Sequence, residues 1–256
     1  MNTNQLNGLR ILNTRPLEQG KVLSQAITDA GGIAIEFPTI SIEATHPDWF
    51  SRLPELTQIN QAIFISTNAV NYFFNGLDEQ RLNWPNNIQP IAVGKASGAA
   101  LSMRGLTSHH IPAIADSEHL LALNTLQQIK QQTILLIKGE GGRPLIAETL
   151  CSRGAHLVSL SVYRRVLPEL SEQYINSLWH DDAVDIILFT SQQAMSNLFT
   201  LFGKEAHAWI CSKPCVVISE RLAKEAALLG MRTIITSSSY DIIPSTLKRI
   251  LHDKQQ

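Results

Sequence analysis

The chain has few cysteines, almost no net charge and no long hydrophobic run. Its three cysteines, Cys151, Cys211 and Cys215, are too few for a disulfide framework, and the last two lack the two-residue gap of a redox or zinc motif. The 21 lysines and arginines nearly balance the 22 aspartates and glutamates, which argues against a protein that mainly holds nucleic acid or an anionic membrane. No window approaches the ~18 apolar residues of a membrane span, and the N-terminus lacks a basic start followed by an apolar stretch. We therefore expect inert or buried thiols, no membrane partner, no nucleic acid and a cytoplasmic location.

Several catalytic signatures are missing as well. The eight histidines show no HExxH or other metal-ligand spacing, and no serine lies in a G-x-S-x-G turn. The nucleotide-binding spacings GxxxxGK[ST] and G-x-G-x-x-G are also absent. These absences weigh against a metal site, against covalent catalysis and against an enzyme that depends on ATP or NAD.

Short apolar runs alternate with longer amphipathic ones from end to end, which is typical of βα units on a parallel sheet. The first unit has a strand at 9–14, a helix that begins near Pro16, and a second strand at 33–37 after a glycine pair. Further strands are expected at 62–66, 90–93, 133–137, 155–160, 184–189, 214–218 and 232–235. The sequence therefore predicts an α/β protein with more strands than one simple doubly wound sheet holds.

Two pairs of similar segments share one spacing. Phe64–Val70 resembles Phe189–Met195, and Ala92–Ala100 resembles Val217–Glu225, each time with a separation of 125 residues. In every case a hydrophobic strand leads into the start of a helix. Two matches at one spacing indicate duplicated domains.

Two extended segments, Pro38–Glu43 and Ser161–Val166, each follow a helix, a glycine and a strand. We interpret them as chain crossings between an outer domain and a domain inserted into it. The predicted boundaries are 1–38 plus 168–256 for the outer domain, 43–160 for the inserted domain, and 39–42 and 161–167 for the linker strands. Two sequential halves that divide near residues 125–130 stay open as an alternative.

The strand-to-helix turns at Ser66–Asn68 and Ser191–Gln193 place hydroxyls beside free helix N-terminal amides. Each serine could be only a helix cap. However, four such turns on two domains point to a shared ligand site, because ligands of open α/β sheets bind beyond the carboxyl ends of the strands.

The turn Lys138–Arg143 has the glycine content of a phosphate or carboxylate cradle, although a flexible turn would have the same composition. Positive groups lie at or near strand ends at Arg15, Lys95, Arg143 and Arg221, where each could also be a solvated surface charge. The phenol of Tyr163, in the second extended segment, could donate a hydrogen bond to a ligand or simply pack.

Short motifs are spread over nearly the whole chain, at Ile11–Pro16, Phe64–Val70, Val93–Ser97, Lys138–Arg143, Gly154–Arg165, Phe189–Ser191 and Ser219–Arg221. Together they resemble the motifs of the uroporphyrinogen-III synthase family. Ile65 and Ser97 depart from the family, which often has threonine at both positions. The order and spacing of the motifs carry the resemblance.

The resemblance implies a bilobal fold of two flavodoxin-like parallel-sheet α/β domains joined by a two-stranded linker. It also implies the reaction. Linear hydroxymethylbilane loses its hydroxyl as water and closes to uroporphyrinogen III, with inversion of ring D, in heme biosynthesis. No metal and no organic cofactor are expected.

The family's tyrosine before a basic pair falls on Tyr163, which would be catalytic and assist loss of the hydroxyl. Its polar contacts fall on Ser66, Ser97, Thr190 and Ser191. Together with the turns and charges above, the predicted substrate-binding residues are Arg15, Ser66, Asn68, Lys95, Ser97, Lys138, Gly139, Arg143, Thr190, Ser191, Ser219 and Arg221. Helix-end amides and scattered cations suit a substrate with eight carboxylates.

We expect a monomer that makes a transient contact with the deaminase of the preceding step. The competing interpretation is a two-lobed binder of an anionic small molecule without catalytic activity. Turnover of hydroxymethylbilane separates the two, because a binder shows affinity without product.

Overall fold

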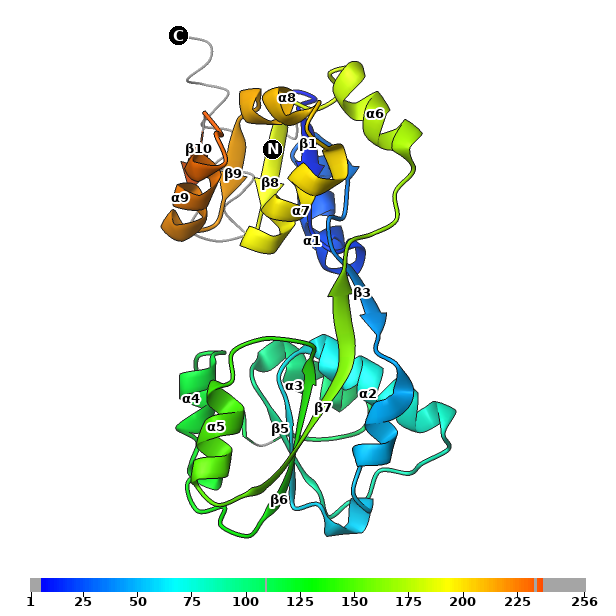
Figure 1. Cartoon of the computed structure of the whole chain (residues 1–256), viewed down its shortest axis with the longest axis vertical. Coiled ribbons are helices and arrows are strands. Elements are labelled where there is room, and N and C mark those ends of the chain that lie inside the picture. Colours follow the sequence, from blue (N-terminus) through cyan, green and yellow to red (C-terminus); the bar gives the residue numbers. More distant parts are fainter. Residues whose placement is uncertain (1–5, 109, 233, 237–256) are drawn as a thin grey trace. The chain divides into compact units, whose positions relative to one another are not determined.

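The structure is a computed structural model that describes residues 6–108, 110–232 and 234–236. The chain forms two compact units. Unit 1 consists of Met1–Ser41 and Val166–Gln256, and unit 2 of Ile42–Arg165. Each unit contains helices and a five-stranded sheet dominated by parallel strands (Figure 1), so the predicted α/β class is confirmed.

Unit 1 has the strand order β10-β9-β8-β1-β2, and all its strand pairs are parallel. The strands are β1 (Arg10–Asn13), β2 (Ile33–Glu36), β8 (Ile186–Phe189), β9 (Cys215–Val217) and β10 (Ile234–Thr236). The helices are α1 (Leu17–Asp29), α6 (Glu172–His180), α7 (Gln192–Phe202), α8 (His207–Ser212) and α9 (Glu220–Leu228). Helix α1 begins after Pro16, whose fixed φ suits a helix start, and Gly31 follows its end at φ +82°.

The sheet of unit 1 is covered on both faces. Leu12, Ile187 and Phe189 belong to a core cluster with α6, α7, α8 and α9. Ile11 and Leu188, which alternate with them along the strands, belong to a second cluster with α1. Because both faces are buried there, the central strands β8 and β9 are continuous apolar runs.

Unit 2 has the strand order β3-β7-β6-β4-β5, and the pairs among its last four strands are parallel. The strands are β3 (Ser41–Ala44), β4 (Gln61–Phe64), β5 (Gln89–Ala92), β6 (Thr133–Gly139) and β7 (His156–Val166). The helices are α2 (Thr67–Glu79), α3 (Lys95–Met103), α4 (Ser117–Leu121) and α5 (Leu145–Ser152), with 3-10 turns at Pro47–Arg52, Leu56–Gln58 and Asn124–Leu126.

The sheet of unit 2 is also covered by helices on both faces. Phe64, Leu135 and Ile137 pack with α2 and α3 in one cluster, whereas Ile63 and Leu136 pack with α4 and α5 in the other. The alternation along each strand therefore decides which helix pair a side chain meets.

Two strands lie where the chain passes from one unit to the other. The sequence predicts a linker at 161–167 that is separate from the strand before it, but β7 runs without a break from His156 to Val166. Its neighbour β3 contains Glu43, whose carboxylate meets Arg164 at 3.3 Å, and the Thr45 hydroxyl that follows donates to the carbonyl of Ser161 at 2.6 Å. These contacts run in opposite order along the two segments.

The similar motifs occupy different positions in their sheets. Strand β4, which precedes the first motif, lies between β5 and β6, whereas β8, which precedes the second, lies between β1 and β9. If β3 is not counted, β4 is the first strand of unit 2 in chain order, whereas β8 is the third strand of unit 1. The 125-residue spacing thus pairs similar strand-to-helix turns and not equivalent strands.

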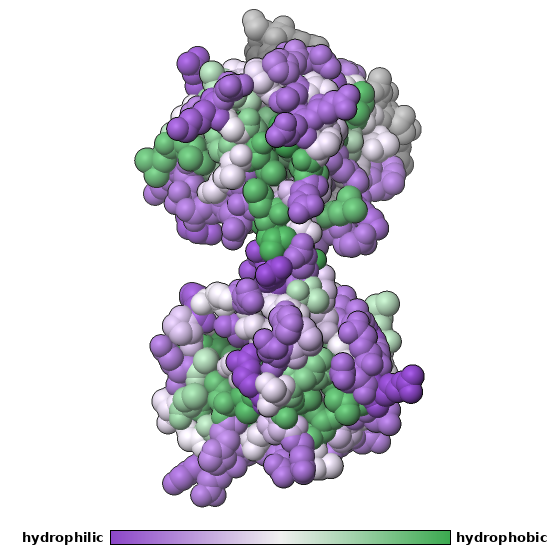
Figure 2. Space-filling model, turned by 45° about the vertical axis from the view of Figure 1, so that its right-hand side comes forward, coloured by the Kyte–Doolittle hydropathy of each residue, from purple (hydrophilic) through white to green (hydrophobic). Residues whose placement is uncertain are grey.

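Hydrophilic residues dominate the face of the molecule in Figure 2, with hydrophobic residues grouped on both units. The most exposed large hydrophobic residues among those described are Met103, Leu228 and Val22, at 90%, 83% and 82%. They lie on three different helices, α3, α9 and α1.

Candidate functional site

Most of the predicted site residues lie just beyond the carboxyl ends of parallel strands. In unit 2 they are Ser66 and Asn68 after β4, Lys95 and Ser97 after β5, Lys138 and Gly139 at the end of β6 with Arg143 after it, and Tyr163 in β7. In unit 1 they are Arg15 after β1, Thr190 and Ser191 after β8, and Ser219 and Arg221 after β9. Because parallel strands end at the same edge, each unit collects its own set at one edge of its own sheet.

Tyr163 is turned into the core of unit 2 by a bulge in β7. Lys138 pairs with Ser161 but Gly139 pairs with Tyr163, so that β7 has one extra residue, Val162, at this point. A bulge interrupts the alternation of side chains along a strand. The consecutive residues Val162 and Tyr163 are accordingly both buried, at 1% and 2% exposure, in the same hydrophobic cluster.

Gly139 makes room for the Tyr163 ring. A Cβ atom on Gly139 would lie 2.6 Å from Cζ of that ring, closer than real Cβ contacts come. The strand β6 continues through Gly139, beyond its predicted end at residue 137, and the amide of Glu140 donates to the Tyr163 carbonyl at 2.8 Å. The beginning of the glycine-rich turn is therefore part of the sheet, and Gly141 and Gly142, both at positive φ, form the turn itself.

The phenol of Tyr163 meets a hydroxyl at the end of β4. Tyr163 Oη lies 3.1 Å from Ser66 Oγ, and either atom can be the donor. Ser66 is also the N-cap of α2, where its Oγ accepts from the amide of Ala69 at 3.0 Å. The two hydroxyls therefore lie at the positive end of a helix dipole. In addition, the guanidinium of Arg165 lies 5.9 Å from the centre of the Tyr163 ring.

Three features hold the Tyr163 phenol in place: the bulge in β7, the close approach of the ring to Gly139 and the contact with the Ser66 hydroxyl. A phenol that hydrogen-bonds to a capping hydroxyl can pass its proton to a leaving group while serine stabilises the oxygen left behind. Tyr163 and Ser66 are 97 residues apart in the sequence, and folding brings together these two predicted residues.

The other turns hold their hydroxyls differently. Ser191 caps α7 through an acceptor contact of 3.1 Å with the Ala194 amide, and Ser219 caps α9 at 3.3 Å from the Leu222 amide. Gly94 caps α3 without a side chain, and Ser97 lies 3% exposed in the first turn of that helix. Thr190 and Asn68 are the remaining predicted polar groups at these turns, next to Ser191 and in the first turn of α2. Each turn leaves helix N-terminal amides for an anion.

The predicted cations differ in their surroundings. Arg143 forms an ion pair with Glu118, Nη1 to Oε1, at 3.1 Å, so this cation already has a carboxylate partner. Lys95 and Arg221 are exposed and Lys138 is half-buried, and none of the three forms an ion pair with another described residue. Arg15 follows the end of β1, where its backbone N–H donates to Asn13 Oδ1 at 3.3 Å.

Comparison with known proteins identifies the relationship. The family model described as uroporphyrinogen-III synthase HemD matches residues 21–244. The uroporphyrinogen-III synthase of Salmonella typhimurium is 30% identical over 237 residues, which cover 91% of this chain and 96% of that protein. The enzyme of Proteus mirabilis is 33% identical over 70% of this chain and 92% of its own length.

The chain belongs to the uroporphyrinogen-III synthase family. The predicted family membership and the enzymatic function that follows from it, in porphyrin and heme biosynthesis, are confirmed. Solved structures agree at the level of the fold. A uroporphyrinogen III synthase mutant from Thermus thermophilus matches with a TM-score of 0.61 at 18% identity, covering 97% of this chain and 99% of that one. The Helicobacter pylori enzyme matches with a TM-score of 0.59 at 14% identity, covering 96% and 99%.

A buried polar network near the strand ends of unit 1 was not predicted from the sequence. The Thr14 hydroxyl donates to the carbonyl of Leu188 at 2.6 Å, and the Thr39 hydroxyl donates to the carbonyl of Thr14 at 3.1 Å. Asn197 of α7 donates to the carbonyl of Thr39 at 2.7 Å. The network fastens the segment after β2 to the ends of β1 and β8 in this family member. The sequence did contain a signal for this network, because the polar residues Asn13 and Thr14 directly follow the buried apolar residues of β1.

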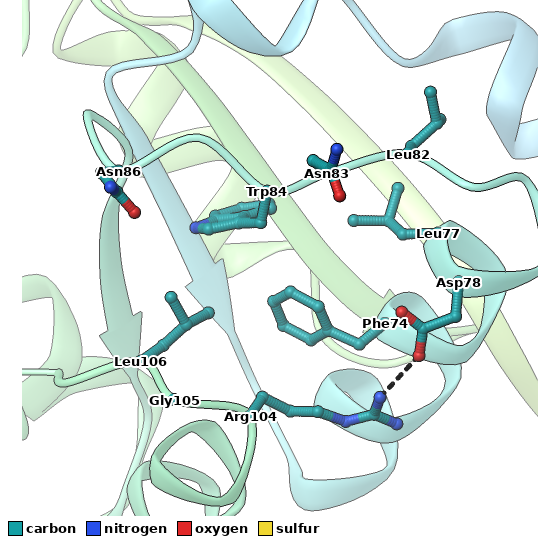
Figure 3. A pocket seen from close by; sticks show the side chains of 10 residues that line it. All are labelled: Phe74, Leu77, Asp78, Leu82, Asn83, Trp84, Asn86, Arg104, Gly105 and Leu106. Atoms are coloured by element: carbon teal, nitrogen blue, oxygen red, sulfur yellow. Dashed lines mark hydrogen bonds and ion pairs between the residues drawn. The ribbon is translucent and has the colours of Figure 1, made fainter.

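A pocket of about 380 Å³ lies elsewhere in unit 2 (Figure 3). It is lined by the last turns of α2 and by residues around Trp84 and Leu106, and Arg104 Nη1 meets Asp78 Oδ2 there at 2.8 Å. Because α2 begins where β4 ends, the last turns of α2 lie toward the opposite edge of the sheet from Ser66. No predicted site residue lines this pocket.

The cysteines are unpaired. Cys211 and Cys215 are buried and Cys151 is exposed. Burial raises the pKa of Cys211 and raises that of Cys215 to about 12, which keeps both thiols protonated near neutral pH. Among the residues that the structure describes, no three His, Cys, Asp or Glu side chains are grouped to hold a metal ion. None of the helices in the described ranges is long and apolar enough to cross a membrane.

Proposed function

We propose that the chain closes linear hydroxymethylbilane to uroporphyrinogen III with inversion of ring D, and that Tyr163 is the proton donor of its first step. The observation that carries this role is the buried phenol, held 3.1 Å from the Ser66 hydroxyl at the carboxyl end of β4. A nearby helix N-terminus stabilises negative charge on either oxygen.

In the proposed step the phenol proton passes to the substrate hydroxyl as the carbon–oxygen bond breaks. Water leaves, and the pyrrole nitrogen supplies the electrons that form an azafulvenium cation, which keeps its N–H proton. The Tyr163 oxygen, briefly anionic, is stabilised by the Ser66 hydroxyl and the Arg165 guanidinium beside its ring. The substituted carbon of ring D then attacks through a spiro intermediate, so that the remaining task of the protein is to hold the chain in the orientation that leads to the III isomer.

Substrate carboxylates would bind at the helix N-termini after β4, β5, β8 and β9 and at the cations beside them. Lys95, Lys138 and Arg221 are available for this role, since none of them forms an ion pair with another described residue. Arg143 would exchange Glu118 for a substrate carboxylate, and the exchange costs little because both side chains are more than half exposed. Arg15, Asn68, Ser97, Gly139, Thr190, Ser191 and Ser219 complete the proposed binding set.

We also propose that units 1 and 2 are the flavodoxin-like domains of a bilobal enzyme, with β3 and β7 as the two-stranded linker. Strand order supports the first part. In both units the second strand lies on one side of the first, and the third and fourth lie on the other, when β4 is counted as the first strand of unit 2. The boundaries predicted from the sequence, the monomeric state, the cytoplasmic location and the transient contact with the deaminase stay predictions.

The test is to give freshly generated hydroxymethylbilane to the purified protein, oxidise the products and separate porphyrin isomers I and III by chromatography. A dominant III isomer without added cofactor is expected. If a folded, monodisperse sample gives only the spontaneous I isomer, the proposed reaction is wrong, and binding of the substrate without turnover would favour the anion-binding alternative.

A further inference from the structure

Tyr72 of α2 lies against the ring of Tyr163. The two ring centres are 6.0 Å apart with an angle of 24° between the planes, within the range of favourable aromatic pairs. Tyr163 has Gly139 against its ring, where a Cβ would approach Cζ to 2.6 Å. The Tyr72 ring therefore adds a further contact to those of the bulge, Gly139 and the Ser66 hydroxyl, which also hold Tyr163.

Tyr72 is itself held by the strand where the chain enters unit 2. Its hydroxyl donates to the carbonyl of Ile42 in β3 at 2.7 Å. Burial first, and then the negative charge of Glu43, raise the pKa of Tyr72, so this hydroxyl keeps its proton and remains a donor. Tyr72 also lies on the helix that Ser66 caps, so one rigid element carries both contacts to Tyr163.

We propose that Tyr72 is a positioning residue for the reaction: its ring and its hydrogen bond to β3 hold the Tyr163 phenol at Ser66 Oγ. This inference rests on the proposed role of Tyr163. Tyr72 need not touch the substrate. It acts by narrowing the orientations of the Tyr163 ring, and small errors in the placement of a reacting group are costly in rate.

A double-mutant cycle tests the proposal with the full chain and hydroxymethylbilane. Tyr72→Leu removes the ring and the hydroxyl, and it should lower kcat by about tenfold while KM changes by less than about twofold. Tyr72→Phe keeps the ring and should lower kcat by about threefold. In the Tyr163→Phe background, either Tyr72 substitution should lower kcat by less than about twofold further, because no phenol is left to position.

Tyr174 provides a matched control in unit 1. Its hydroxyl donates to the carbonyl of Glu36 at 3.3 Å, and its ring lies 5.9 Å from that of Phe37. Tyr174→Leu therefore loses similar contacts and should leave kcat unchanged for the folded protein.

The proposal is wrong if the Tyr72 substitution lowers kcat by the same factor in the Tyr163→Phe background as in the natural sequence. It is also wrong if Tyr174→Leu lowers kcat as much as Tyr72→Leu does. If Tyr72→Leu does not fold, the cycle with Tyr72→Phe decides by the same criterion. A Tyr163→Phe variant with unchanged kcat would instead reject the proposed role of Tyr163, which is a separate and recognisable result.

Discussion

Ser66 in unit 2 and Ser191 in unit 1 begin helices in nearly the same way, yet only one of them meets a phenol. Each follows a buried parallel strand and accepts a hydrogen bond from the amide three residues later, at 3.0 Å and 3.1 Å. Ser66 has a further partner, Tyr163, 3.1 Å away. Within the described ranges, Ser191 has no second side-chain partner of this kind.

The neighbouring strands account for the difference. In unit 2 the bulged β7 brings a tyrosine to the end of the sheet, and Gly139 leaves space for its ring. In unit 1 the side chains near the ends of β1 and β8 are those of Thr14, Thr39 and Asn197, which donate hydrogen bonds to backbone carbonyls. The same local turn is therefore a helix cap in unit 1, whereas in unit 2 it is a helix cap and also a hydrogen-bond partner of a buried phenol.

The largest difference between the two units is expected at Tyr163. We expect Tyr163→Phe to lower kcat by about 10–100-fold, because the ring and its packing remain while the proposed proton donor is lost. The measurement is the initial rate of isomer III formation at saturating hydroxymethylbilane. Unchanged kinetics would show that the Tyr163 hydroxyl has no catalytic role.

A second substitution acts on the space beneath the ring. Gly139→Ala would place its Cβ 2.6 Å from the Tyr163 ring and should destabilise the protein by about 1–3 kcal/mol while lowering kcat. Gly20→Ala in α1 of unit 1 is the counterpart, since its Cβ would meet Asn13 Nδ2 at a milder 3.1 Å. Gly139→Ala should lower both the free energy of unfolding, measured with urea, and kcat by more than Gly20→Ala does. If the two variants lose equal stability and have equal kcat, the space that Gly139 leaves for the Tyr163 ring is not important.

The two serine caps should respond differently to the same substitution. Ser66→Ala and Ser191→Ala should each cost about 1 kcal/mol of stability, because each removes one N-cap. Ser66→Ala should also lower kcat by about 3–10-fold, which corresponds to one lost hydrogen bond. Thermal unfolding and kcat measured side by side test both statements. A similar loss of kcat in the two variants would mean that the Tyr163 contact is not what distinguishes them.

Low pH should have a small effect on the stability of unit 1. Arg10 joins β1 to Asp185 before β8, with Nη2 to Oδ1 at 2.7 Å, and its hydrogen bond lowers the pKa of Asp185. In unit 2 the comparable junction is neutral, since the Thr133 amide donates to Asn60 Oδ1 at 2.8 Å.

A lowered carboxyl pKa contributes stability that is complete above the unfolded pKa of about 3.9 and is lost as the pH falls through the folded value. We therefore expect unit 1 to lose stability below about pH 4, by about 1 kcal/mol or less because the pair is partly exposed. Asp185→Asn should remove this pH dependence in urea titrations at pH 3 and pH 6. If the pH dependence is unchanged in that variant, other carboxylates are responsible for it.

Much of the fold could be predicted because its signals are local. The run Ile186–Phe189 is buried on both faces and is found at the predicted strand, and Ser66 and Ser191 cap helices as their positions indicated. The similar motifs at a spacing of 125 residues follow strands at different positions in their sheets, because a strand-to-helix turn has the same sequence requirements wherever it lies in a sheet.

The α/β class, the helix caps and the collection of site residues at the ends of parallel strands could all be read from the amino-acid order. They follow from periodicity and from the shared direction of the strands. Folding in three dimensions was needed to turn Tyr163 into the core, to make Ser66 and Tyr72 its neighbours, and to bring Arg143 to Glu118. Those contacts depend on strand register and on helix packing between segments far apart in the chain. A one-residue bulge is enough to send a side chain to the other face of its sheet, and no local pattern in the sequence marks it.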